Sequence, residues 1–501
     1  MKRVLGRLRS WWQRRPNPAA AGEQLAPLGG DAGRRFAFVT SAYDTPPDLL
    51  RELAACIAAQ NESGAQWVLV DNGTNDRASR ECLEELAKNA FVKLVPVAKN
   101  QGILGGMRAA LAAADREFVV PVDSDDLVAP HTIRALGHAL RTTPDAKFLF
   151  SDEDHFTDGQ HVNPFYRVGW DPALALACSY IWHLCAFDRQ AALELGVYSD
   201  DGANYCHDWD TLLRFVRAGH RPRHVADVLY SWRTHAASTT NNDAEAHSGS
   251  LDSQRHVLQL HLRSLGQADR FAVRDCPLWR GARELRVERL AVDVPTVPIV
   301  DSLAELQATI AADAFAVLVR DPRVRIAEAD ALVELIGWLE LLPEVAIVGG
   351  RLLDEHGVVV SAGYFPSPNG GLAAPDAGRS GDDPGYLAMA LKPRVVAAVP
   401  SGYVLVRGAW LAALGEQLAG GPERGAPLVA WLSQLARASG QAVVCTPFVT
   451  GTGPVAAGEF PAEFPEEFSV ELPVEFAGKF AGKALGEFAL RGVWHGAHGC
   501  S

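Results

Sequence analysis

Residues 119–130 read VVPVDSDDLVAP, so an apolar run passes directly into a cluster of carboxylates. In an extended segment, side chains two residues apart face the same way, and Asp123 and Asp125 can therefore present two carboxylates to one ion. Such hard oxygen ligands suit Mg2+ or Mn2+ held jointly with phosphate, not zinc. The stretch predicts a metal site at the end of a buried strand, although Asp125 or Asp126 could instead cap the next helix.

Apolar segments around this stretch predict the class of fold. Strands are expected at 36–40, 67–70, 92–97 and 118–122, and the stretch Asp44-Thr45-Pro46-Pro47 predicts an N-cap and the start of a helix that runs to about Gln60. Strands that alternate with helices indicate an α/β protein with a parallel sheet covered on both faces, whose ligands gather at the carboxyl ends of the strands. Polar residues follow those ends, namely Tyr43, Asp44, Asp71, Asn72 and 123–126.

Two later segments carry groups suited to transfer chemistry. HDWDTLLRF, 207–215, places Asp208 and Asp210 at the head of an amphipathic helix, and VLYSWRTHAAST follows with Arg233 and His235. A carboxylate near a metal and a nucleotide can act as general base, while a guanidinium and an imidazole add a phosphate contact and a metal ligand. Each also has a structural interpretation: Asp208 as an N-cap, His235 as a surface histidine, Arg233 as a solvated charge.

Seven segments together resemble a known family in their order and spacing. They are FAFVTSAYDTP, WVLVDNGTND, NQGILGGMRAAL, PVDSDDL, FLFSDEDHFTDG, HDWDTLLRF and VLYSWRTHAAST. The family is that of the inverting family 2 glycosyltransferases, and the likeness is greatest to bacterial O-antigen and rhamnan-type enzymes. It covers about residues 35–265 and implies a GT-A domain, the Rossmann-like α/β fold of nucleotide-diphospho-sugar transferases.

The resemblance also implies a role for individual residues. The nucleotide contacts would be Tyr43, Asp44, Asp71, Asp123 and Arg233, with Asp71 at the position that usually meets the base. Asp123 and Asp125 would form the DxD pair that binds Mn2+ or Mg2+, with His235 as a further metal ligand. Asp208 fits the catalytic base. Asp152, Glu153 and Trp209 lie where acceptor contacts are expected, and ordinary packing is the alternative for Trp209.

These roles imply one in-line displacement that inverts the anomeric carbon. Asp208 would take the proton of an acceptor hydroxyl while the metal and Arg233 stabilise the leaving nucleoside diphosphate. Two positions depart from the family pattern, because Ser41 replaces proline and His207 replaces Glu or Gln. Neither removes a required group, though His207 could change the pKa or orientation of Asp208. The QxxRW signature of processive synthases is absent, which favours the transfer of one or a few sugars per encounter.

A second α/β domain is expected from about residue 270 to 455. Apolar segments recur at 315–319, 345–348, 403–406 and 442–448, and EVAIVGGRLLDEHGVVVSAGYF resembles the middle of another GT-A domain. VLVRDPRV leaves Asp321 without a second carboxylate, and ERGAPLVAWLSQLARASG begins without an acid in the place of the base. The resemblance implies a degenerate GT-A-like domain without catalysis, which would hold an acceptor glycan, a partner or its own twin domain. A divergent metal site is the alternative.

Composition limits the partners. A length of 501 residues and a net charge of −13 favour two domains and argue against general affinity for nucleic acid. Residues 1–15 are basic with apolar side chains at helical spacing, which predicts a helix in a membrane interface, or alternatively a solvated tail, and the segment up to residue 34 reads as a linker. No run approaches the roughly 18 apolar residues of a membrane span. The acidic, Phe-rich stretch 456–501 predicts an extended segment that packs on the body or binds a partner, or alternatively a low-complexity tail.

The sequence therefore predicts a metal-dependent, inverting glycosyltransferase. The enzyme would move a sugar from a nucleotide-sugar donor to a hydroxyl of a lipid-linked or polysaccharide acceptor, as in O-antigen or capsule biosynthesis. Eight cysteines without a CxxC pair indicate reduced thiols in the cytoplasm, and the basic segment indicates peripheral attachment to the inner membrane face. The alternative is a non-catalytic glycan-binding or scaffold protein built from transferase-like domains.

Overall fold

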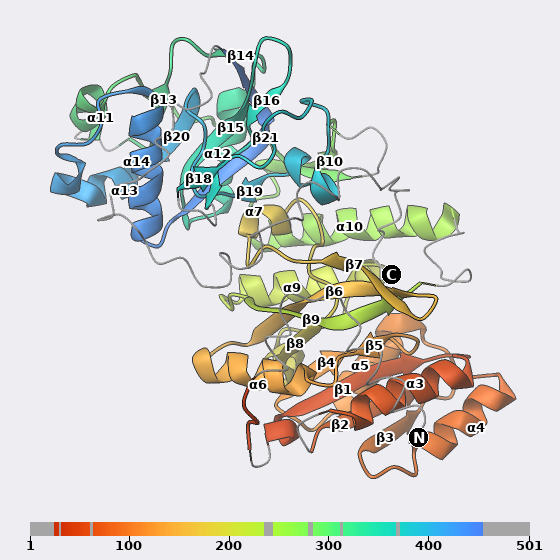
Figure 1. Cartoon of the computed structure of the whole chain (residues 1–501). Helices are drawn as coiled ribbons and strands as arrows, with labels where there is room; N and C mark the ends of the chain where they lie inside the picture. The colour runs from red at the N-terminus through yellow and green to blue at the C-terminus, as the bar shows by residue number, and fades with distance from the viewer. Residues whose placement is uncertain are drawn as a thin grey trace. The chain divides into compact units, whose positions relative to one another are not determined.

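The computed structural model describes residues 25–29, 32–60, 64–234, 244–278, 284–310, 314–366 and 371–453, which form two compact units (Figure 1). The first unit holds the described chain up to Trp170 together with Ser179–Val257. The second holds Asp171–Cys178 and the described chain from Leu258 onward. The predictions for residues 1–15, for His235 and for the stretch 456–501 lie outside the described residues.

The first unit alternates strands and helices as the sequence predicts. The four predicted strands and the first helix are confirmed to within two residues at each end. The elements are β1 (Phe36–Ala42), α3 (Pro47–Ala58), β2 (Gln66–Asp71), α4 (Arg77–Leu86), β3 (Val92–Pro96), α5 (Gly102–Ala113), β4 (Phe118–Pro121), β5 (Leu127–Val128), α6 (Thr132–Thr142), β6 (Phe148–Thr157), β7 (Gln160–Phe165), β8 (Cys185–Asp188), α8 (Arg189–Glu194), α9 (His207–Arg217), β9 (Arg223–Arg233) and α10 (Ala244–Ser264), whose last turns belong to the second unit.

The strands of the first unit form one mixed sheet in the order β3-β2-β1-β4-β8-β6-β9-β5, with β7 paired to β6. The first four strands are parallel, as predicted. The expectation of a parallel sheet is wrong beyond β4, because β8 runs antiparallel to both β4 and β6. The chain between β7 and β8 contains only a one-turn helix, Pro172–Ala175, and no crossover helix, and a strand entered in this way is free to run antiparallel.

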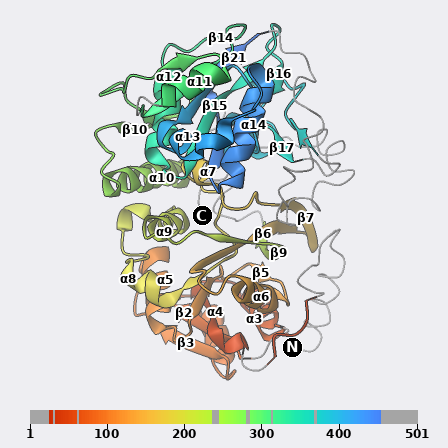
Figure 2. The ribbon, with the colours of Figure 1, turned by 90° about the vertical axis from the view of Figure 1, so that its left-hand side faces the viewer.

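Helices cover both faces of this sheet. Figure 2 shows α5, α8 and α9 on one side and α3 and α6 on the other. Phe36 and Phe38 on β1 pack with Leu50 and Leu53 of α3 in one buried apolar cluster, since alternate residues of a strand face the same side. The parallel strands β1, β2 and β4 all end at one edge of the sheet, which carries the polar residues of the candidate site.

The second unit is also an α/β sheet. The four apolar segments predicted as strands are confirmed as β13, β15, β20 and β21. The elements are α7 (Pro172–Ala175), β10 (Phe271–Asp275), β11 (Leu285–Arg289), β12 (Ile299–Val300), α11 (Leu303–Ile310), β13 (Ala316–Arg320), β14 (Arg325–Ile326), α12 (Ala331–Leu341), β15 (Val345–Leu353), β16 (Val359–Ser361), β17 (Phe365–Pro366), β18 (Leu372–Ala373), β19 (Arg394–Val395), β20 (Tyr403–Arg407), α13 (Gly408–Leu414), α14 (Gly425–Ala438) and β21 (Ala442–Thr452).

The main sheet of the second unit repeats part of the first. Its order β12-β13-β20-β15-β21-β14 corresponds to β1-β4-β8-β6-β9-β5, and the direction of every pairing agrees. Among the described residues, no strand of the second unit takes the places of β2 and β3. The described part of the second unit therefore repeats the portion of the first sheet that runs from β1 to β5 in spatial order, without the outer strands β2 and β3.

The strand pairings allow the two sheets to be matched residue by residue. Phe148 pairs with Phe187 as Ile347 pairs with Val406, and β5 and β14 pair in the same way with β9 and β21. Helices α9 and α14 are both followed by a left-handed glycine, Gly219 and Gly440. Counting from these positions gives the following counterparts: Asp321 for Asp123, Arg323 for Asp125, Val324 for Asp126, Gly402 for His183, Val429 for Asp208 and Gly451 for Tyr230.

Candidate active site

The acidic loop that follows β4, residues 123–126, is held by β9. The Tyr230 hydroxyl donates to Asp126 Oδ2 at 2.5 Å and accepts from the backbone N–H of Asp123 at 3.3 Å. Asp126 also accepts from the backbone N–H of Arg233 at 2.7 Å. Burial and the neighbouring carboxylates of Asp125 and Asp123 raise the pKa of Asp126 well above its usual value. Asp126 thus anchors the loop, and the helix-capping alternative is wrong because α6 begins at Thr132 without a side-chain cap.

Arg233 lies against the same loop. Its Nε donates to the carbonyl oxygen of Asp125 at 2.6 Å, and its terminal nitrogen donates to Glu52 at 2.7 Å. The guanidinium also lies over the ring of Phe156, 5.2 Å from the centroid. Arg233 is therefore a fixed cation beside the acidic loop and not a solvated charge. Its predicted contact with the diphosphate stays a prediction.

His183 faces the acidic loop, and sequence reasoning missed it because SYIWHLC contains no recognisable pattern. Its Nε2 lies 3.5 Å from Asp123 Oδ2, and its ring stacks on Tyr230 with centroids 4.5 Å apart. Burial lowers the pKa of His183, but the hydrogen bond to Asp123 and the surrounding carboxylates outweigh it and raise the pKa to about 9. Partial burial would raise the pKa of Asp123, yet the contact with His183 and the charge of His207 hold it below its usual value.

Glu153 lies behind His183 and is almost buried. Its Oε2 is 3.8 Å from His183 Nδ1 and 3.2 Å from the buried guanidinium of Arg167. Its other oxygen accepts from the Trp182 indole N–H at 2.7 Å. A side chain 3% exposed and paired in this way supports the wall of the site. The predicted contact of Glu153 with an acceptor has no support in this geometry.

Asp208 lies in the first turn of α9, two residues after the N-cap Cys206, so its N-cap interpretation is wrong. Its Oδ2 accepts from the Ser179 hydroxyl at 3.2 Å. Its Oδ1 is buried and makes no hydrogen bond. A buried carboxylate oxygen without a partner is costly to maintain, and that cost is a common feature of groups kept for chemistry.

Asp208 and Asp123 belong to one electrostatic neighbourhood. Burial raises the pKa of Tyr198, and the charges of Asp208 and Asp123 raise it further. His207, next to Asp208 in the chain, helps to lower the pKa of Asp123. Residues 85 positions apart in sequence therefore act on the same surroundings, as the resemblance implies for a metal ligand and a base.

The predicted nucleotide contacts lie at the ends of β1 and β2. Tyr43 is 43% exposed and accepts from the Asn75 side chain at 3.0 Å. Asp44 accepts from the backbone N–H groups of Asn75 and Asp76, so no side chain of its stretch caps α3, whose N-cap is Pro46. Asp71 accepts from the backbone N–H of Thr74 at 2.9 Å. These contacts fix the loop after β2 beside an exposed aromatic ring, and the binding roles stay predictions.

Two predicted acceptor residues have no exposed surface. Asp152 is 0% exposed, and it accepts from His224 at 2.7 Å and from the backbone N–H of Arg167 at 2.9 Å. Trp209 is also 0% exposed and belongs to the core, in line with the packing alternative. A direct contact of either side chain with an acceptor has no support in this structure. The burial of Asp152 depends on the pairing of β6, whereas Trp209 lies on the buried face of α9 with Leu212 and Leu213.

The carboxylates of the acidic loop suit a hard divalent cation only in part. In the described portions of the chain, no group of three or more His, Cys, Asp or Glu side chains could hold a metal ion. Asp123 keeps 41% of its side chain exposed. Two carboxylates that share an ion with phosphate oxygens match the preference of Mg2+ and Mn2+, so the residues fit a metal that arrives with its nucleotide.

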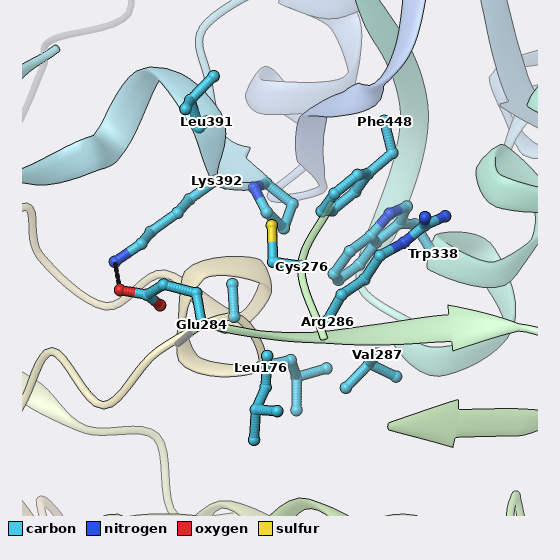
Figure 3. Close-up of a pocket in the computed structure, with 12 residues that line it drawn as sticks. Leu176, Cys276, Glu284, Arg286, Val287, Trp338, Leu391, Lys392 and Phe448 are labelled. Atoms are coloured by element: carbon cyan, nitrogen blue, oxygen red, sulfur yellow. Dashed lines mark ion pairs between the residues drawn. The ribbon is translucent and has the colours of Figure 1, made fainter. Parts of the chain in front are cut away.

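The second unit contains a depression of its own, shown in Figure 3, with about 380 Å3 of empty space including the solvent at its mouth. Lys392 reaches Glu284 at 3.6 Å, and the Arg286 guanidinium lies 4.1 Å from the Phe448 ring centroid. Arg286 also pairs with the buried Glu334 at 2.8 Å. These charged side chains already form ion pairs with one another, which favours a packing role for the depression. The acidic edge of the first unit is the candidate site.

Comparison with known proteins finds a family match that lies mostly within the first unit. Residues 37–192 match the family model described as Glycosyl transferase family 2. An uncharacterized protein of Sinorhizobium fredii is 27% identical over 242 residues, which cover 47% of this chain and 26% of that protein. The O-antigen biosynthesis protein RfbC of Myxococcus xanthus is 24% identical over 235 residues, which cover 46% of this chain and 18% of that protein. The chain thus spans about a quarter or less of these relatives.

Among solved structures, residues 1–349 of TarS from S. aureus are similar to this chain. The match covers 47% of this chain and 66% of that one, with 17% sequence identity and a TM-score of 0.37. In the described part of this chain, no helix has the length and apolar character that a membrane span needs.

Proposed function

We propose that this chain transfers a sugar from a nucleotide-sugar donor to a hydroxyl of a glycan acceptor. Residues 37–192 belong to glycosyl transferase family 2, and the first unit has the GT-A type of α/β sheet. The transfer inverts the anomeric carbon in one displacement. The observation that carries the proposal is the buried, unpaired Oδ1 of Asp208 in the electrostatic neighbourhood of Asp123.

Each group at the site then has a task. Asp208 accepts the proton of the acceptor hydroxyl, and Ser179 orients its carboxylate through the hydrogen bond to Oδ2. Tyr43, Asp44 and Asp71 hold the nucleoside at the ends of β1 and β2. Arg233, fixed against the loop by its bond to the Asp125 carbonyl, exchanges Glu52 for the leaving diphosphate.

Asp123 and Asp125 would hold Mn2+ or Mg2+ together with the donor phosphates, and His235 would complete the set. When bound, the ion neutralises charge that develops on the leaving diphosphate. The acidic loop is already fixed before any ligand binds. Tyr230 accepts from the backbone N–H of Asp123, and the backbone N–H of Arg233 donates to Asp126. A loop fixed in advance loses less conformational entropy when it binds.

The acceptor is a lipid-linked or polysaccharide glycan in this proposal. Its support is the sequence similarity to RfbC, whose name places that protein in O-antigen biosynthesis. The basic segment 1–15 would bring the chain to the cytoplasmic face of the membrane.

The second unit is a non-catalytic GT-A-like copy in this proposal. The register match puts Arg323 in the place of Asp125, and Arg323 donates to both oxygens of Asp321, at 3.1 and 2.8 Å. The hydrogen bond from Arg323 lowers the pKa of Asp321. A guanidinium therefore neutralises the one remaining carboxylate, and the buried Val429 replaces the base. These residues do not fit a divalent cation.

The proposed function is tested by incubating the full chain with a panel of nucleotide sugars and MnCl2, and by measuring release of the nucleoside diphosphate. Turnover that requires Mn2+ and is lost in the double variant Asp123→Asn, Asp125→Asn supports the proposal. The matched control is Asp115→Asn, since Asp115 is an exposed acid in the loop before β4. Failure of the wild-type chain to bind or turn over any nucleotide donor would overturn the proposal.

A further inference from the structure

His183 occupies a position between the acidic loop and the wall of the site. Its ring is sandwiched by contacts rather than exposed: the side chain is 15% exposed, and the plane lies 14° from that of Tyr230. Its Nε2 faces Asp123, while its Nδ1 faces Glu153 at 3.8 Å. The contact with Glu153 is longer than a hydrogen bond, and Nδ1 is buried without a hydrogen-bond partner. The shorter of the two polar contacts of this imidazole is therefore the one with Asp123, at 3.5 Å.

The second unit shows what the same sheet does without this histidine. Gly402 stands in the place of His183, and Gly451 stands in the place of Tyr230. Val324, the counterpart of Asp126, fills the space, because a methyl group added to Gly402 or Gly451 would lie 3.1 or 2.8 Å from Val324 Cγ1. The strand order and directions are unchanged. Neither the imidazole nor the phenol is thus required to build this half of the sheet.

The groups that the second unit lacks form one set. The counterpart of Asp125 is a cation, the counterpart of Asp208 is a valine, and the counterparts of His183 and Tyr230 are glycines. The histidine disappears together with the metal-binding and base positions, while the strands around it remain. The comparison of the two units therefore indicates that His183 serves the chemistry of the first unit and not the folding of its sheet.

We infer that His183 is a positioning residue for Asp123, and the inference rests on the proposed function. The 3.5 Å ion-pair contact of Nε2 with Oδ2 restricts the orientation of the carboxylate, so that its other oxygen is available to the divalent cation. Tyr230 holds the ring by stacking and holds the backbone of Asp123 by accepting its N–H. Groups that orient a metal-binding carboxylate typically change metal affinity or activity about 10- to 100-fold when they are removed.

The test compares nucleotide binding by calorimetry with and without Mn2+. The wild-type chain is first titrated with UDP, GDP and dTDP in MnCl2 to find the nucleoside diphosphate that it binds. His183→Ala is expected to weaken that affinity about 10- to 100-fold in Mn2+ and to leave the affinity in EDTA unchanged. His183→Gln retains an N–H donor and should recover most of the loss. In turnover assays, the effect of His183→Ala should appear mainly in the KM for donor.

A buried histidine of the same unit provides the matched control. His131 pairs with Asp227 at 3.0 Å, both almost fully buried and neither at the site. His131→Ala should lower the melting temperature without changing the Mn2+-dependent affinity. Equal affinity of His183→Ala and wild type in Mn2+ would overturn the inference while the proposed function stands, as would equal losses with and without Mn2+. A wild-type chain that binds none of the three nucleotides would instead count against the proposed function.

Discussion

The Tyr230 hydroxyl and the Asp126 carboxylate lie 2.5 Å apart although 104 residues separate them in the chain. This one contact ties β9 to the loop that follows β4. Through its phenol oxygen Tyr230 also accepts from the backbone of Asp123, and through its ring it supports His183. A single side chain therefore sets the position of the loop and of its neighbour.

Tyr230→Phe removes the hydroxyl and keeps the ring. Asp126 loses one of its buried partners, so the free energy of unfolding of the first unit should fall by about 1–3 kcal/mol. The affinity for the Mn2+ nucleotide complex should also fall, because the backbone of Asp123 loses its acceptor. Denaturant titration and calorimetry measure the two effects. Tyr180→Phe, which removes a hydroxyl donated to the carbonyl of Gly169, is the control and should affect stability alone.

Asp208→Asn should abolish most transfer while the fold is kept. An amide cannot accept the proton of the acceptor hydroxyl, and loss of a general base lowers kcat about 10²- to 10⁴-fold. Donor binding should stay within a few-fold of wild type, since Asp208 makes its hydrogen bond to Ser179 and not to the acidic loop. The measurements are kcat with saturating donor and a melting temperature.

The control for this prediction lies two residues further along the same helix. Asp210 pairs with Arg214 at 2.7 Å and is 2% exposed. Asp210→Asn should therefore reduce stability and leave kcat within a few-fold of wild type. If Asp208→Asn keeps half of the wild-type kcat, Asp208 is not the base.

The sequence predicts the first half of the first sheet well, and the physical reason is local. Strands such as 67–70 are continuous apolar runs bounded by polar residues, and Asp71 marks the edge at which each parallel strand ends. The later half is harder to predict, because the direction of β8 depends on a loop and not on a helix. The burial of Asp152 follows from the pairing of β6 with its neighbours, whereas the burial of Trp209 agrees with the apolar face of α9, which also carries Leu212 and Leu213.

The site shows the same division. DSDD and HDWD were recognisable because chemistry needs those residue types at short spacing. His183 and Tyr230 act through contacts between segments far apart in sequence, His183 on Asp123 and Tyr230 on Asp126. The sequence shows Arg323 close to Asp321 in the second unit. That Arg323 takes the place of Asp125 could be recognised only from the strand pairings. Long-range pairing is thus the information that the sequence alone does not carry.

Asp321→Asn and Asp123→Asn form a matched pair across the two units. Asp123→Asn should abolish Mn2+-dependent nucleotide binding, because it removes an anionic ligand. Asp321→Asn should leave both the affinity and a stoichiometry of about one nucleotide per chain unchanged, since Arg323 already neutralises that carboxylate. Calorimetry gives both quantities. Two binding events per wild-type chain, with one lost in Asp321→Asn, would show that the second unit holds a working site.

Asp171 makes the stability of the second unit dependent on pH. Burial raises its pKa from 3.8 to about 6, although the backbone N–H groups of Leu174 and Val395 and the charge of Arg394 oppose the shift. A carboxyl group with a raised folded-state pKa stabilises the fold below pH 3.8, and that contribution is lost as the pH rises through 6. Over this window the wild-type chain should lose on the order of 3 kcal/mol relative to Asp171→Asn, which does not titrate. Asparagine keeps the cap on α7, because its oxygen can accept from Leu174 as Asp171 does.

The loss of the hydrogen bond to Val395 in this variant is independent of pH. The measurement is the difference in unfolding free energy between the two proteins at pH 4 and at pH 7.5, and the same difference at both values would contradict the prediction.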